Sequence, residues 1–152
     1  EDYDPPGIRG DAPVRAARYW GLSQQEYYAK ADVWPLAPEG EILVVIQCED
    51  VQAIENLPSI LKEVPGIGVV LIGEGDLSQE LGYPRQYDHP VVADAIHSIL
   101  AICKENNVPC GHPHPDTQNT ARLVEEGYRF LMPGAGRSYA ALDQGRTLTG
   151  RE

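Results

Sequence analysis

The chain has 152 residues, the length of one ordinary domain, and its 42% of hydrophobic residues are enough to build a buried core. A formal net charge of −11 at pH 7 repels nucleic acid and anionic membranes, so we expect a small molecule or another protein as partner. No stretch approaches the roughly 18 consecutive apolar residues of a membrane span. The first residues have neither the basic start nor the apolar middle of a signal peptide, which favours a cytoplasmic protein without a membrane partner.

The number and spacing of the cysteines also favour a cytoplasmic protein. The three residues, Cys48, Cys103 and Cys110, are odd in number and lack the spacing of a metal site. We therefore expect free and mostly buried thiols in a reducing environment rather than a disulfide framework.

Residues 1–40 contain many prolines and glycines, which break up long periodic elements. Only residues 23–30 have a helical pattern, with Ser23 as a capping residue and Glu26 completing a capping box. We expect an irregular lead-in over residues 1–40 with one short helix.

From residue 41 to 152 the pattern predicts four strand–helix units. The apolar runs lack polar alternation, so their strands should be buried on both faces of a parallel α/β sheet. We expect Pro58 to interrupt the first helix, with residues 59–64 adding another turn or two. Residues 73–78 should form a turn before a loop that leads to Pro90. The strands are predicted at 42–47, 67–72, 108–112 and 128–132, and the helices from Asp50, at 90–106, from Asp116 or Thr117 to Gly127, and from Ser138.

Four such units form half of an eight-stranded barrel. Half a barrel leaves two open sheet edges, which are costly to expose. The chain should therefore pair with another copy or be one piece of a longer protein.

Two carboxylates follow two of the predicted strands: Glu49 ends the first apolar run and Asp76 follows the second. Functional groups of a parallel sheet gather at the carboxyl ends of its strands, so both acids should lie on one rim. Mg2+ and Mn2+ are usually held by one or two carboxylates, with water and substrate oxygens completing the shell. The spacing predicts a site for a hard divalent cation.

Several motifs along nearly the whole chain resemble the HpcH/HpaI aldolase family, and they match the carboxyl-terminal part of such an enzyme. The resemblance implies a single partial domain over residues 1–152, about half of a modified TIM (β/α)8 barrel. The motifs are Pro5-Pro-Gly-Ile-Arg-Gly10, Arg15-Ala-Ala-Arg-Tyr19, Gln47-Cys-Glu49, Glu55-Asn-Leu-Pro58, Gly73-Glu-Gly-Asp-Leu-Ser78, Leu81-Gly-Tyr83 and His89-Pro90.

The resemblance also implies a chemistry: class II aldolases use Mg2+, Mn2+ or Co2+ to bind pyruvate or a related 2-keto acid and stabilise its enolate. They make or break a carbon–carbon bond to an aldehyde, and they commonly form oligomers. By this resemblance Glu49 and Asp76 are metal ligands, Gln47 is a polar neighbour that contacts substrate, and the turn at Gly75 and Asp76 receives the pyruvate carboxylate. His112 stands near an apolar family position that contacts substrate.

The family's general-base histidine and enolate-stabilising arginine lie on earlier strands, which the resemblance places upstream of residue 1. No catalytic acid or base is therefore assigned to this chain. A Schiff-base lysine is not required, and none of the three lysines, Lys30, Lys62 and Lys104, follows an apolar strand.

Other interpretations stay open at this point. The related citrate-lyase and malyl-coenzyme-A-lyase branch uses two acids on a barrel rim to cleave thioesters, and a truncated, catalytically silent chain with a structural role would also fit half a barrel. Glu74 stands where the family usually has proline and is expected to be a solvated rim residue rather than a ligand. His112 and His114 suggest either a second metal site or, preferentially, substrate-pocket lining. His89 and His97 are expected in a loop and on a helix surface.

Overall fold

A computed structural model describes residues 13–133 and 139–151 of the chain. The chain divides into two compact units, Glu1–Ile42 and Leu43–Glu152, each of which is described by itself. Among the described residues, no helix has both the length and the apolar composition needed to cross a bilayer.

The first unit contains two short helices, where the sequence predicted one. Helix α1 (Val14–Tyr19) directly follows Pro13 and is closed by Gly21, whose φ is +69°, so proline and glycine flank this helix instead of interrupting it. Helix α2 (Gln24–Lys30) begins with the expected capping box of Ser23 and Glu26.

A two-stranded sheet follows the two helices. It pairs β1 (Val33–Trp34) with β2 (Ile42–Leu43), and Ile42 is the last residue of the first unit.

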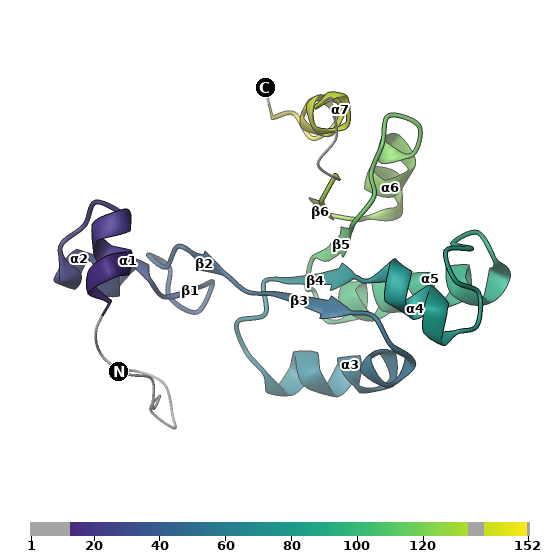
Figure 1. Ribbon diagram of the computed structural model, residues 1–152, viewed down its shortest axis with the longest axis horizontal. Helices are drawn as coiled ribbons and strands as arrows, with labels where there is room; N and C mark the ends of the chain where they lie inside the picture. Colours follow the sequence, from purple (N-terminus) through teal and green to yellow (C-terminus); the bar gives the residue numbers. More distant parts are fainter. Residues whose placement is uncertain (1–12, 134–138, 152) are drawn as a thin grey trace. The chain divides into compact units, whose positions relative to one another are not determined.

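The second unit is built on a four-stranded parallel sheet (Figure 1). Its strands lie side by side in chain order, which confirms the parallel α/β prediction. They are β3 (Val45–Cys48), β4 (Val69–Ile72), β5 (Cys110–His112) and β6 (Phe130–Leu131).

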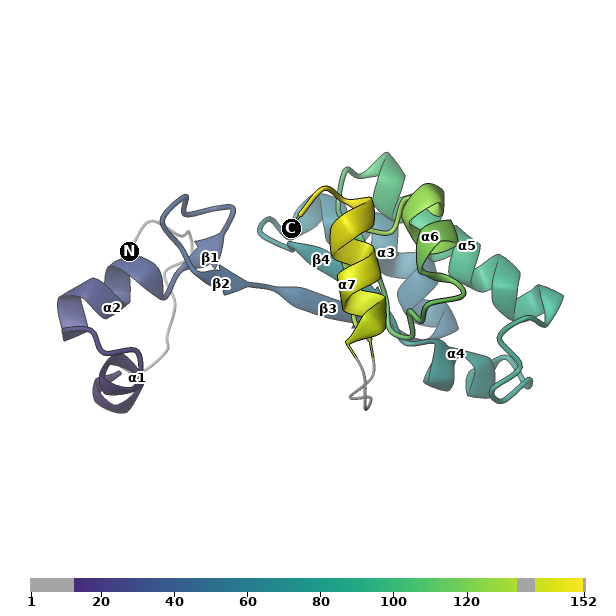
Figure 2. The same ribbon diagram turned by 90° about the horizontal axis from the view of Figure 1, so that it is seen from above.

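Helices α3 and α5 contact each other and the strands, and α7 packs against α6 (Figures 1 and 2). The last predicted helix was expected to start at Ser138, which lies outside the described residues. The helices of this unit are α3 (Val51–Glu63), α4 (Glu74–Glu80), α5 (Pro90–Glu105), α6 (Thr120–Glu126) and α7 (Ala140–Leu148).

Helix α3 begins as predicted, because the Asp50 side chain accepts a hydrogen bond of 2.6 Å from the backbone N–H of Ala53. The prediction that Pro58 interrupts it is wrong, since α3 continues to Glu63. Pro58 is exposed, while Leu57 before it is 1% exposed and belongs to the core. Packing of this kind outweighs the loss of one backbone donor.

The expected turn after β4 is a helix instead. Gly73 is the N-cap of α4, and Leu77 and Ser78 are both fully buried. Leu81, four residues after Leu77, also packs against the core cluster. This helical spacing of apolar contacts explains why the glycine-containing segment forms an α-helix rather than an extended turn.

Burial differs between the first two strands of the sheet. All four residues of β4 are buried, as predicted for a strand covered on both faces. In the edge strand β3, Val45 is 39% exposed and Gln47 is also exposed, so the same prediction is wrong there. The face of β3 that carries Ile46 and Cys48 packs against the core cluster, whereas the opposite face is open among the described residues.

All three cysteines are free and buried, as expected. Burial raises the pKa of the Cys48 thiol to about 12. Buried, protonated thiols of this kind behave as small apolar side chains rather than as nucleophiles.

The cap of α3 can be tested directly. Asp50→Ala removes the acceptor for an otherwise unpaired backbone N–H and should lower the free energy of unfolding by about 1 kcal/mol. Asp50→Asn keeps a side-chain acceptor and should cost far less. Urea denaturation of both variants checks this, and equal losses in the two would contradict the capping role.

Candidate functional site

Strand pairing places Glu49 at the carboxyl end of the sheet. Cys48 of β3 lies opposite Ile72 of β4, so the next residues, Glu49 and Gly73, leave the two strands side by side. The Gln47 amide Nε2 donates a hydrogen bond of 2.7 Å to Glu49 Oε2. A Cβ atom on Gly73 would lie 2.7 Å from that oxygen and 2.8 Å from the amide nitrogen. The Gln47–Glu49 pair therefore occupies space that only glycine at position 73 leaves free.

Asp76 lies on the same rim, in the first turn of α4, and it is exposed. It lines a cavity of about 340 Å3 that opens between α4 and the segments after α4 and β5. The residues that line this cavity, called here the rim cavity, are Gly75, Asp76, Gln79, Arg85, Tyr87 and His114.

Glu49 and Asp76 follow neighbouring strands of the sheet, and carboxylate oxygens are the donors that hard divalent cations take, so these two residues are the candidate ligands. Gln47 holds only one oxygen of Glu49, which leaves Oε1 as a donor. No group of three or more His, Cys, Asp or Glu side chains is arranged for a metal in the part of the chain that the structure describes. A cation here would thus take two protein carboxylates and complete its shell with water and substrate oxygens.

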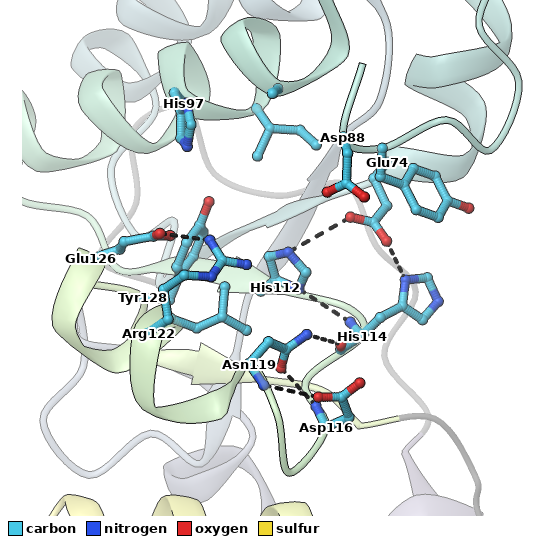
Figure 3. A pocket seen from close by; sticks show the side chains of 14 residues that line it. Glu74, Asp88, His97, His112, His114, Asp116, Asn119, Arg122, Glu126 and Tyr128 are labelled. Atoms are coloured by element: carbon cyan, nitrogen blue, oxygen red, sulfur yellow. Dashed lines mark hydrogen bonds and ion pairs between the residues drawn. The ribbon is translucent and has the colours of Figure 1, made fainter. Parts of the chain in front are cut away.

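Glu74 differs from its expected role as a solvated rim residue. It is only 4% exposed, and its carboxylate lies between two imidazoles (Figure 3). Oε1 is 2.5 Å from His114 Nδ1 and Oε2 is 3.6 Å from His112 Nε2. A buried carboxylate needs such partners, since an unpaired charge in the interior is strongly unfavourable.

The hydrogen bonds of His112 define its tautomer. Its Nδ1 accepts from the backbone N–H of His114 at 3.3 Å, so the neutral ring carries its proton on Nε2, which faces Glu74. Burial lowers the pKa of His112, and the Glu74 carboxylate opposes this effect. With Nε2 acting as a donor, the ring favours a hydrogen-bonded role over metal ligation.

His112 also lines a second cavity, of about 660 Å3, between residues of α5 and α6. The Tyr128 ring stands edge-on to the His112 ring at a centroid distance of 5.2 Å. His97, expected on a helix surface, is exposed on α5 and also lines this cavity, which shares Tyr87 and His114 with the rim cavity. His89 precedes α5 as its N-cap and stacks on Tyr83 rather than entering either cavity.

The structure thus brings Gln47 and Glu49 into direct contact and places Gly75 and Asp76 in the rim cavity. His112 lies instead against Glu74 and the larger cavity. The Glu74 network could have been anticipated, because the His112-Pro-His114 motif ends the strand that pairs with β4. Arg85 gave no such signal in the sequence, since its place in the rim cavity depends on the path of the loop after α4.

Comparisons with known proteins define the family. The family model described as HpcH/HpaI aldolase/citrate lyase matches residues 2–139, and the chain belongs to this family. A 4-hydroxy-2-oxovalerate aldolase from Rhodococcus jostii is 43% identical over 132 residues, and a 4-hydroxy-2-oxo-heptane-1,7-dioate aldolase from Escherichia coli is 34% identical over 134 residues. Each alignment covers 87% of this chain and 47% of the relative.

A crystal structure of a family protein from Burkholderia cenocepacia matches with a TM-score of 0.73 at 26% identity, covering 99% of this chain and 55% of that one. The chain therefore has the fold of about half of such a TIM-barrel-like protein, and it spans about half the length of the curated relatives it matches.

Burial of His112 makes stability depend on pH. Near and below the ordinary imidazole pKa of about 6.5, His112 binds a proton more readily in the unfolded chain than in the folded chain, where its pKa is lower. The free energy of unfolding should therefore decrease as the pH falls from 7.5 to 5.5, with at most about 1.4 kcal/mol per pH unit from one proton. Urea denaturation across this range should show a shallower dependence for His112→Gln, and an unchanged dependence would contradict the assignment.

Proposed function

We propose that the chain is the metal-bearing part of an aldolase that acts on pyruvate or a related 2-keto acid. The observation that carries this proposal is the β3–β4 register, which puts Glu49 beside Gly73 with Asp76 three residues further along. Family membership and the printed names of the aldolase relatives support the same chemistry. The proposed ion is Mg2+, Mn2+ or Co2+, because the two donors are hard carboxylate oxygens.

Each residue has a distinct task in this proposal. Glu49 and Asp76 hold the cation, and Gln47 fixes the orientation of Glu49 through its amide hydrogen bond. The bound cation would supply a Lewis acid that withdraws electron density from the substrate oxygens. The backbone at Gly75 and Asp76 receives the carboxylate of the 2-keto acid, as the family resemblance implies, and His112 stays a candidate for pocket lining.

Ligand-induced stabilisation tests the site. A ligand that binds only the folded state at 100 times its Kd stabilises that state by about 2.7 kcal/mol, so Mn2+ with pyruvate should raise the Tm by several degrees. Asp76→Asn and Glu49→Gln should abolish the increase. Asp94→Asn, an exposed acid on α5, is the matched control and should retain it.

Turnover separates the competing functions. Cleavage of a 4-hydroxy-2-oxo acid would support the aldolase. Thioester cleavage without aldol turnover would instead place the chain in the citrate-lyase-like branch. An absent Tm shift together with no turnover would favour a catalytically silent chain.

A pair of glycine substitutions probes the geometry without removing any ligand. In Gly73→Ala the new methyl group would displace Glu49 and Gln47, so the affinity for Mn2+ alone should fall by about tenfold or more. A Cβ on Gly75 meets nothing within 4 Å, so Gly75→Ala should bind Mn2+ like the unmodified chain. Electron paramagnetic resonance of free Mn2+ checks both variants, and equal affinities would contradict the proposed position of Glu49.

A further inference from the structure

Arg85 has an unusual backbone conformation at the rim cavity. Its φ is +59°, a left-handed value that residues with a Cβ adopt rarely and glycine adopts freely. The Arg85 backbone N–H donates a hydrogen bond of 2.9 Å to Ser78 Oγ, and this fully buried hydroxyl donates 2.8 Å to the Gly75 carbonyl. The loop that carries Arg85 is thereby tied to the first turn of α4.

Arg85 lines the rim cavity together with Gly75 and Asp76. Within the described parts of the chain, its guanidinium makes no ion pair or side-chain hydrogen bond, although Asp76 lines the same cavity. In Arg122, by contrast, the guanidinium pairs with Glu126 at 2.6 Å. The Arg85 guanidinium therefore keeps its donors available to a ligand.

The positive charge of Arg85 stands out on an acidic chain and indicates an anionic ligand. The chain has 23 acidic and 12 basic residues, so its average field repels anions. Among the six residues that line the rim cavity, Arg85 is the one with a permanent positive charge. A planar guanidinium binds a carboxylate through two parallel hydrogen bonds, which a lysine ammonium does not reproduce.

We propose that Arg85 is a specificity-determining residue that binds a substrate carboxylate in the rim cavity. The inference rests on the proposed function, in which a 2-keto acid occupies this rim. The carboxylate can belong to the 2-keto acid or to an acidic aldehyde partner, and both present the same chemistry to the guanidinium. The hydrogen bond from the Arg85 backbone N–H to Ser78 Oγ holds this left-handed residue at the cavity.

Two variants of the full chain test the proposal. Arg85→Gly removes the charge and suits the left-handed backbone, whereas Arg85→Lys keeps a charge without the planar fork. Calorimetric titration with pyruvate and with 4-oxobutanoate, an aldehyde acid, should show at least one of them binding tenfold or more weakly to Arg85→Gly. Binding to Arg85→Lys should be intermediate, and the Tm of Arg85→Gly should not fall.

Titrations with and without Mn2+ separate this inference from the proposed function. If the unmodified chain binds neither Mn2+ nor pyruvate, the aldolase proposal fails, and the effect of Arg85→Gly on 4-oxobutanoate binding still decides the role of Arg85. If Arg85→Gly weakens the binding of pyruvate alone, Arg85 binds the carboxylate of the 2-keto acid. If it weakens the binding of 4-oxobutanoate alone, Arg85 binds the carboxylate of the aldehyde. Unchanged binding of both acids, or no binding of either acid by any variant, overturns the proposal.

Discussion

Parallel pairing of β3 with β4 is the constraint on which the candidate site depends. The pair is aligned so that Cys48 lies opposite Ile72, and the residues that follow meet at one rim of the sheet. Because Gly73 has no side chain, the Glu49 carboxylate can lie over the start of α4. A shift of this register by one residue would turn Glu49 to the opposite face and separate it from the rim.

The next strand pair brings a second group of polar side chains together, around a buried carboxylate. Pairing of β4 with β5 brings Glu74 against His112 and His114, and this carboxylate is the one that is buried among the described residues. Both oxygens of Glu74 thereby face imidazole nitrogens, one of His112 and one of His114. Asp76, two residues later and exposed, keeps its oxygens for ligands. Neighbouring acids on one short helix thus have different environments, because Glu74 is buried and Asp76 is exposed.

Local patterns in the sequence predicted those features that local physics determines. The buried strand β4, the start of α3 at Asp50 and the end of α6 at Gly127 each follow from a few adjacent residues. The uninterrupted course of α3 through Pro58 and the place of Arg85 in the rim cavity depend on packing and loop paths that a single sequence does not reveal. Burial of Glu74 becomes predictable only once β4 is known to pair with β5. The strand pattern alone predicted a cation site at Glu49 and Asp76, and family resemblance supplied the expected roles of Gln47, Gly75 and His112.

The hydrogen bond from Gln47 to Glu49 has a consequence for the energetics of ligand capture. A glutamate that is free to rotate loses side-chain rotamer entropy when it grips an ion, and this loss weakens binding. The hydrogen bond from Gln47 restricts this freedom in the folded chain. Part of the entropy cost would therefore be included in the free energy of folding, which would favour binding of the proposed cation.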